Sequence, residues 1–197
     1  MAQPFAVFDI DGTLIRWQLF HAIVHRLGER GLLLPGAHER IRKARMAWKN
    51  RQAGHGFHEY EMALVEGYRQ ALKDIEPTHY HHVVQEVFDE YKDQTYIYTR
   101  ELLGRLKHKG YFLIAISGSH HEVIEKLAMR YGFDVAVGAS FEQVDGRFSG
   151  NFSSPVFDKA AALTSIMAKH NLAKKGSYAV GDSKSDAPLL AMVDRPI

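Results

Sequence analysis

The chain has 197 residues, 46% of them hydrophobic and 24% charged, which is typical of a soluble globular protein with one main core. Its formal net charge of +2 argues against nucleic acid or an anionic membrane surface as a partner. The lack of cysteine excludes disulfides and thiolate chemistry, and the first apolar run is too short for a signal peptide or a spanning helix. We therefore expect a cytoplasmic protein without membrane insertion.

The first predicted element is a buried strand, Phe5–Ile10, which leads into two acids, Asp9 and Asp11. Side chains two residues apart in a strand point to the same side, so both carboxylates should converge at the end of the sheet. Two buried carboxylates need a partner to stay ionised together. Mg²⁺ prefers oxygen ligands, and Gly12 allows the backbone to approach a ligand closely, so the pattern predicts a magnesium site.

Residues 16 to about 98 show only helical periodicity. Their apolar side chains form three stripes at helical spacing, which usually pack into a core. The stripes are Trp17, Phe20, His21, Val24 and Leu27; Phe57, Tyr60, Leu64, Tyr68 and Leu72; and Tyr80, Val83, Val84, Val87, Phe88 and Tyr91. We expect this insert to form an all-helical cap over the ligand-binding edge of a sheet.

Strands and helices alternate after the insert. The predicted strands are Tyr111–Ser117, Asp134–Ser140 and Ser177–Ser183, and the predicted helices are Glu101–Lys109, His120–Tyr131 and Phe157–His170. This alternation predicts an α/β fold with a doubly wound parallel sheet. The expected domains are an α/β core of residues 1–15 and 99–197 and a helical cap of residues 16–98.

The segment Ser140–Phe152 is a predicted hairpin, because Asp145-Gly146 is a strong two-residue turn signal between short strand-like runs. It fits either a small flap near the site or an ordinary surface hairpin.

Further polar residues follow the other predicted strands. Asp182 and Asp186 come at the end of the last strand, and Ser117-Gly118 ends the second. Lys159 opens the helix before the last strand and could reach the same edge. Parallel strands present ligands at their carboxyl ends, so these groups should meet there. Acids, a strand-end hydroxyl and a fixed positive charge together suit phosphoryl transfer.

Ser119 and Glu122 match a capping box, which predicts that a helix begins at this point and can seat a phosphate at its N-terminus. We expect His120 and His121 to be exposed at the helix start, although they could touch the substrate. The spacing of the other histidines does not match a zinc site.

These motifs, Asp9-Ile10-Asp11-Gly12-Thr13, Ser117, Lys159 and Gly181-Asp182…Asp186, occur in an order that resembles the haloacid dehalogenase (HAD) superfamily of phosphohydrolases. The helical insert and the hairpin before Lys159 resemble the phosphoserine phosphatase-like branch. The resemblance implies a HAD-like Rossmannoid core and Mg²⁺-dependent hydrolysis of a small phosphomonoester through an aspartyl-phosphate. It also implies a further strand and helix after the last motif, for which the segment following Asp182 looks too short.

The resemblance implies that Asp9 is the nucleophile and that Asp11 acts as general acid and base. The metal ligands would be Asp9, the backbone carbonyl of Asp11, and Asp182, and Asp186 would hold the ligands or Lys159 in place. The phosphate would be bound by Thr13, Ser117, Gly118 and Lys159.

The resemblance to phosphoserine phosphatases is weaker at the residues that would recognise the substrate. Phosphoserine phosphatases carry an acid nine residues after the nucleophile, where this chain has Gln18. Their cap also supplies an arginine; the candidates here are Arg40, Arg42, Arg45 and Arg51, and we take Arg45 as the working candidate. The substrate could therefore be a phosphorylated alcohol, an amino alcohol or a lipid headgroup.

Each motif also has a structural explanation. The Asp-Gly pair could be a plain turn, Asp186 a helix-start acid, Ser117 a strand-end hydroxyl and Lys159 a solvated surface residue. Two other functions stay open: a phosphotransferase or mutase that uses the same intermediate, and a HAD-like protein that binds without catalysis. The sequence does not predict the oligomeric state.

Overall fold

The structure is a computed structural model that describes residues 2–197. It divides into two compact units, which are described separately here. The first consists of Met1–Leu19, Phe88–Ser140 and Ser153–Ile197, and the second of Phe20–Val87 and Phe141–Phe152.

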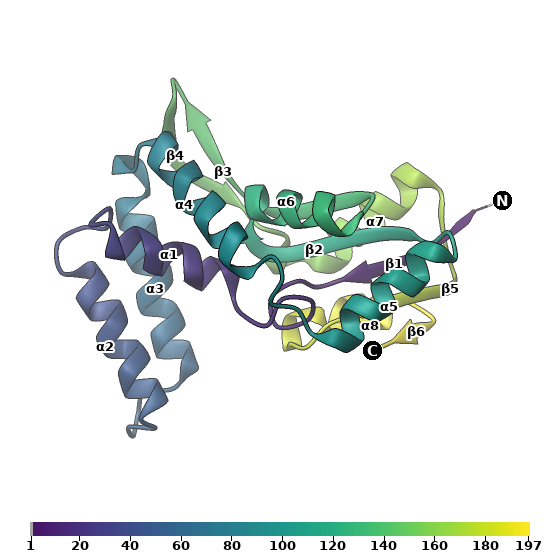
Figure 1. The fold of residues 1–197 in the computed structure, drawn as a ribbon, viewed down its shortest axis with the longest axis horizontal. Coiled ribbons are helices and arrows are strands. Elements are labelled where there is room, and N and C mark those ends of the chain that lie inside the picture. Colours follow the sequence, from purple (N-terminus) through teal and green to yellow (C-terminus); the bar gives the residue numbers. More distant parts are fainter. Residues whose placement is uncertain (1) are drawn as a thin grey trace. The chain divides into compact units, whose positions relative to one another are not determined.

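The chain forms a six-stranded sheet of order β4-β3-β2-β1-β5-β6 (Figure 1), all of which belongs to the first unit except the end of β3 and most of β4. The strands are β1 (Gln3–Phe8), β2 (Phe112–His120), β3 (Val135–Val144), β4 (Arg147–Ser153), β5 (Leu172–Val180) and β6 (Arg195–Pro196). β1 pairs in parallel with both β2 and β5, β2 with β3, and β5 with β6. The prediction of an α/β fold with a doubly wound parallel sheet is confirmed.

Helices pack on both faces of this sheet. They are α5 (Ile97–His108), α6 (His121–Tyr131), α7 (Lys159–His170) and α8 (Ala187–Ala191), with two short 3₁₀ turns, η2 (Pro155–Phe157) and η3 (Lys184–Asp186). On one face, Phe5 and Val7 of β1 join a buried cluster with Leu163 of α7 and Leu189 of α8. On the other, Phe8 meets Phe133, just after α6, edge to face at 5.8 Å.

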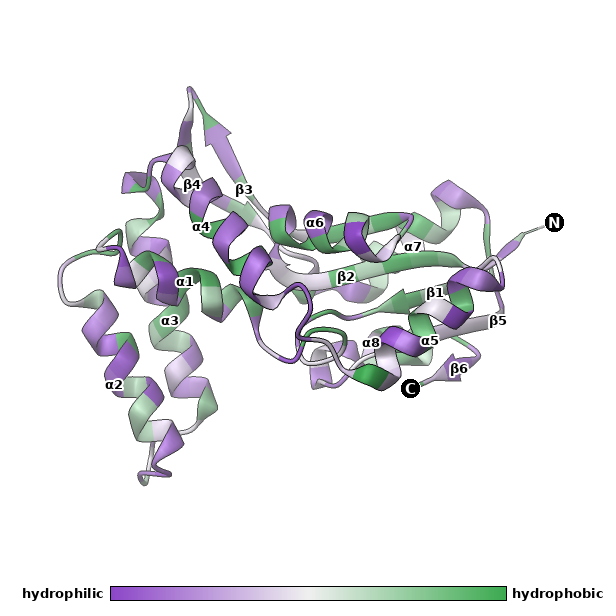
Figure 2. Ribbon diagram, viewed as in Figure 1, coloured by the Kyte–Doolittle hydropathy of each residue, from purple (hydrophilic) through white to green (hydrophobic). Residues whose placement is uncertain are grey.

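Burial on both faces explains why β1 after Gln3 and β2 up to Ile116 are apolar (Figure 2). β1 lies between β2 and β5. The chain therefore adds β2 and β3 on one side of β1 first, and later adds β5 and β6 on its other side. In sheets of this kind, such a switch in direction opens a crevice at the carboxyl ends of the strands. The acidic motifs lie at these ends.

The boundary between β2 and α6 differs from the prediction. β2 continues to His120, which lies opposite Ala139 of β3, and α6 begins at His121 with His120 as its N-cap. His120 is fully buried, so the expectation of an exposed helix-start histidine was wrong. The pairing with β3 keeps this segment extended and covers the side chain. Burial lowers the pKa of His120 to about 3 and so keeps it neutral.

The segment after Asp182 contains both a short helix, α8, and a two-residue strand, β6. β6 extends the sheet beside β5, with Tyr178 opposite Arg195. The strand and helix that the resemblance implies after the last motif are therefore present, each in a short form.

The second unit contains α2 (Ala37–Lys49), α3 (Phe57–Ala71) and η1 (Leu72–Asp74), together with most of α1 (Leu19–Glu29) and α4 (Pro77–Tyr91). Tyr60, Tyr68 and Tyr80 are its largest fully buried side chains. The hairpin of β3 and β4 contributes two rings, because Phe141 packs on Tyr68 and Phe148 on Tyr80 with centroids 5.3 and 5.1 Å apart.

The hairpin turns at Asp145 and Gly146, which have φ angles of 49° and 75°. Positive φ at both positions is what a two-residue turn of this handedness requires, and the Asp-Gly signal had predicted it.

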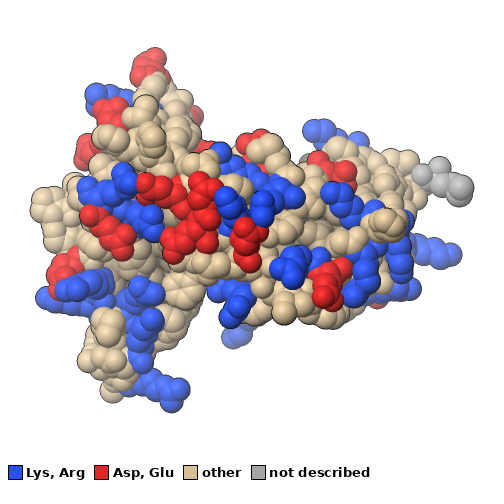
Figure 3. All heavy atoms as spheres, viewed as in Figure 1, with Lys and Arg blue, Asp and Glu red and all other residues tan. Residues whose placement is uncertain are grey.

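Among residues 2–197, no helix combines the length and the apolar character needed to cross a bilayer. Basic and acidic side chains are interspersed over the face seen in Figure 3.

Candidate active site

The backbone that carries Asp9 and Asp11 leaves the sheet as a tight turn. The amide of Asp9 still donates to the carbonyl of Val180 at 2.9 Å, which extends the pairing of β1 with β5 by one bond. The amides of Thr13, Leu14 and Ile15 then donate to the carbonyl of Ile10. Gly12 has φ of +84°, a conformation that other residues adopt only with strain.

Gly12 also lies close to the acid that follows β5. A Cβ at this position would lie 2.3 Å from Oδ2 of Asp182. The turn after β1 and the acid after β5 are therefore in close contact, and Oγ1 of Thr13 donates a hydrogen bond to Oδ1 of Asp182 at 3.1 Å.

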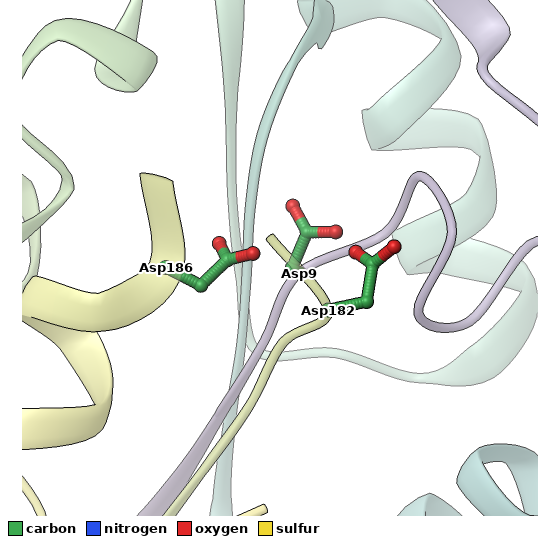
Figure 4. Close-up of side chains that lie close together, drawn as sticks. All are labelled: Asp9, Asp182 and Asp186. Carbon is green, nitrogen blue, oxygen red and sulfur yellow. The ribbon is translucent and has the colours of Figure 1, made fainter. Parts of the chain in front are cut away.

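Three carboxylates meet at this edge of the sheet: those of Asp9, Asp182 and Asp186 (Figure 4). One oxygen from each lies within 4.8 Å of the others. Asp9 and Asp186 are buried, whereas Asp182 is exposed, so the cluster can be reached from solvent.

Lys159 connects two of these acids. Its ammonium donates to Oδ1 of Asp9 at 2.7 Å and to Oδ1 of Asp186 at 2.6 Å, and its side chain is only 2% exposed. Burial alone would lower the pKa of Lys159, but the charges of Asp9 and Asp186 outweigh this and raise it. The explanation of Lys159 as a solvated surface residue is thereby excluded.

Asp186 is held from its other side as well. Its Oδ2 accepts hydrogen bonds from the amide and the hydroxyl of Ser183, at 3.0 and 2.7 Å. This fixes the carboxylate that supports Lys159. Ser183 was missed as a site residue, although Ser183 and Asp186 have the spacing of a capping box.

Asp11 lies beside the cluster, and both of its carboxylate oxygens accept hydrogen bonds. Oδ1 accepts from the amide of Leu19 at 2.5 Å and Oδ2 from the hydroxyl of Ser117 at 2.6 Å. Ser117 is fully buried and its oxygen accepts from the amide of Ser119 at 2.9 Å. The contact with Leu19 was not predicted, because a backbone amide leaves no signal in the sequence.

The electrostatics of the site favour an added cation. Burial raises the pKa of Asp9 to about 7, despite the opposing effect of Lys159. Burial also raises the pKa of Asp11, against the lowering by Ser117 and Leu19. Four carboxylates and a single ammonium leave an excess of negative charge, which a divalent cation would neutralise.

The donor set also fits a small, hard cation. Two oxygens bound to one Mg²⁺ at about 2.1 Å lie roughly 3–4 Å apart, and the three carboxylate oxygens lie within 4.8 Å of one another.

The residues predicted to contact the substrate, Gln18 and Arg45, are not among the side chains that meet at this edge of the sheet. Gln18 is half-buried and directly precedes Leu19. Arg45 lies on α2 in the helical unit, near His21, His25 and Tyr60, where its charge helps to lower the pKa of both histidines to about 4.

Comparison with known proteins places the chain in a family. The sequence profile of the haloacid dehalogenase-like hydrolase family matches residues 6–191. The chain is 31% identical over 137 residues to phosphoserine phosphatase SerB1 of Mycobacterium tuberculosis, an alignment that covers 66% of this chain and 44% of that protein. The chain thus spans less than half the length of this relative.

A second relative is matched along most of its length. Histidinol-phosphatase of Neisseria meningitidis is 24% identical over 205 residues, which covers 98% of this chain and 88% of that protein.

Solved structures share the fold. A phospho-aspartyl intermediate analogue of phosphoserine phosphatase superimposes with a TM-score of 0.68 at 20% identity and covers 100% of this chain and 86% of its own. A protein of unknown function from Bordetella pertussis gives a TM-score of 0.74 at 20% identity, with coverage of 100% and 89%. Because the family profile matches residues 6–191, nearly the whole chain, the chain belongs to the haloacid dehalogenase-like hydrolase family.

Proposed function

We propose that this protein is a Mg²⁺-dependent phosphomonoesterase that acts through an aspartyl-phosphate on Asp9. The main support is the geometry around Asp9, whose carboxylate is oriented by Lys159 and shares its edge of the sheet with Asp182 and Asp186. The relatives named phosphoserine phosphatase and histidinol-phosphatase support a small phosphate ester as the substrate. Such a substrate suits a cytoplasmic enzyme.

In the first step, an oxygen of Asp9 attacks phosphorus, and the bond from phosphorus to the alcohol oxygen breaks. Asp11 gives a proton to the departing alkoxide. In the second step, Asp11 takes a proton from a water molecule, which attacks phosphorus and breaks its bond to Asp9. The products are the alcohol and inorganic phosphate, and both acids return to their starting states.

Residues around Asp9 bind the phosphoryl group. The ammonium of Lys159 offsets its negative charge, and the hydroxyls of Thr13 and Ser117 with the amide of Gly118 supply donors from two strand ends. Thr13 and Ser117 now donate to carboxylates. Both would exchange those acceptors for phosphate oxygens.

The metal ligands that we propose are Asp9, the backbone carbonyl of Asp11, and Asp182, with Asp186 beside them. Bound Mg²⁺ would supply positive charge that draws phosphate oxygens toward the nucleophile.

We further propose that the helical insert, residues 16–98, acts as a cap that excludes water and selects the substrate. Gln18 and Arg45 are its candidates for substrate contact. The core of residues 1–15 and 99–197 would carry the chemistry.

The test is hydrolysis of 4-nitrophenyl phosphate with and without Mg²⁺, with inorganic phosphate and nitrophenol both measured. We expect equal amounts of the two products, activity that is lost in EDTA, and a fall of at least about 10³-fold in Asp9→Asn. Phosphate recovered on an added alcohol instead would indicate a transferase.

The control is Asp145→Asn, an equally conservative change at the exposed hairpin turn, where asparagine tolerates the positive φ. Circular dichroism should show that both variants fold. Equal activity of Asp9→Asn and the wild type would overturn the proposal.

A further inference from the structure

A short apolar turn, η2 (Pro155–Phe157), immediately precedes Asp158 and Lys159. It exposes two large apolar side chains in sequence: Val156 is 41% exposed and Phe157 is 74% exposed. Exposed apolar residues that adjoin one another often mark a surface that contacts a ligand or partner. Single exposed apolar residues are common on protein surfaces and need no explanation.

The turn is held in place from both ends. The amides of Val156 and Phe157 donate to the side chain and the carbonyl of Ser154, both at 3.4 Å, and the amide of Asp158 donates to Pro155 at 3.0 Å. Asp158 then caps α7 through the amide of Ala161 at 2.8 Å. Side chains carried by such a turn are presented without the entropic cost of ordering a mobile loop.

The turn also lies next to the proposed phosphate site. A Cβ added to Gly118 would lie 3.3 Å from Cβ of Val156, so Val156 packs over the strand end that carries Ser117. On the other side, Phe157 is two residues before Lys159, so their Cα atoms are at most about 7 Å apart. Lys159 itself contacts Asp9 at 2.7 Å.

We propose that Val156 and Phe157 bind the leaving alcohol of the substrate, and that this alcohol carries an apolar or aromatic group. The inference rests on the proposed function and adds the substrate class to it. Neither side chain offers a charge or a hydrogen bond, so a charged alcohol such as serine would gain nothing from this surface. An alkyl or aryl group that covers the two side chains would remove apolar surface from water, which favours binding.

The test compares ethyl phosphate with 2-phenylethyl phosphate. Both leave as primary alcohols, so their kcat/KM values differ mainly through contacts with the phenyl ring. We expect the wild type to prefer the phenylethyl ester at least about tenfold, which is the range of discrimination that an apolar contact provides. Phe157→Ala should bring the ratio of the two values close to one, and Phe157→Tyr, which keeps the ring, should preserve most of the preference.

Met129→Ala is the matched control, because Met129 is 70% exposed but lies on α6. It should leave the ratio unchanged. A wild-type ratio near one, or an equal fall for both esters in Phe157→Ala, would overturn the inference while 4-nitrophenyl phosphate is still hydrolysed. Failure to hydrolyse any of the three esters with Mg²⁺ would overturn the phosphatase proposal and this inference with it.

Discussion

The carboxylate of Asp11 accepts a hydrogen bond at 2.5 Å from the backbone amide of Leu19, the first residue of α1. An ionised carboxylate at a helix N-terminus is stabilised by the free amides and the helix dipole. The proposed general acid is thus tied to the start of the helix that leads into the helical unit.

Asp11→Asn should therefore separate substrates by their leaving groups. We expect a small effect on 4-nitrophenyl phosphate, whose leaving group departs without a proton, and a fall of about 10²–10⁴-fold for an alkyl phosphate. Steady-state kinetics on both esters measures this. Equal losses on the two would show that Asp11 is not the proton donor.

Lys159→Met should destabilise the core unit. Asp9 and Asp186 would remain buried without their cation, which costs about 3–5 kcal/mol of unfolding free energy. Urea unfolding in EDTA measures the loss, and added Mg²⁺ should restore part of it. Lys175→Met, at an exposed position, should change the unfolding free energy little.

Gly12→Ala tests the close approach of the turn to Asp182. Gly12 and Gly110 have similar φ angles, +84° and +76°, but only Gly12 has atoms of another residue within reach of an added Cβ. Gly110→Ala should cost about 1–2 kcal/mol from backbone strain alone. Gly12→Ala should lose more stability and should also weaken Mg²⁺ binding measured by calorimetry. Equal behaviour of the two variants would contradict the contact.

Stability should fall in mild acid because of His21. Burial, with nearby His25 and Arg45, lowers the pKa of His21 from 6.5 to about 4. Between these values the unfolded chain binds more protons, so the contribution is fully present above pH 6.5 and is lost as pH falls toward 4. His21 should account for roughly 2 kcal/mol between pH 7.5 and 5.

Unfolding of wild type and His21→Gln at both pH values measures this contribution. The variant should show a smaller difference between the two, whereas His79→Gln, at an exposed position, should behave as the wild type does. An unchanged pH dependence in His21→Gln would contradict the assignment.

Short-range patterns predicted the parts of the fold that depend on short-range chemistry. The apolar run before Asp9 predicted a buried strand, which is β1, and the Asp145-Gly146 pair predicted the hairpin turn. The meeting of Asp9 and Asp182 followed from one rule, that parallel strands end at a common edge, and Lys159 reaches that edge from the start of α7.

Features that depend on distant partners were not predictable in this way. The Ser119–Glu122 pattern favoured a helix start at Ser119, but pairing of His120 with Ala139 kept the chain extended. β5 begins earlier than predicted, at Leu172, because Leu172 and Ala173 pair with Gln3 and Pro4 of β1 before the polar Lys174 and Lys175. α2 gave no apolar stripe, since only Ala37, Ile41 and Ala47 of its residues are buried.

The bond from the amide of Asp9 to the carbonyl of Val180 has a consequence for ion choice. It joins the backbone of Asp9, the proposed nucleophile, to the strand that ends just before Asp182, so the backbones that carry the two acids are held together. A spacing fixed in this way tolerates a narrow range of ionic radii. Calcium, with its longer bonds to oxygen and its preference for more ligands, should occupy this position poorly and compete with magnesium without supporting turnover.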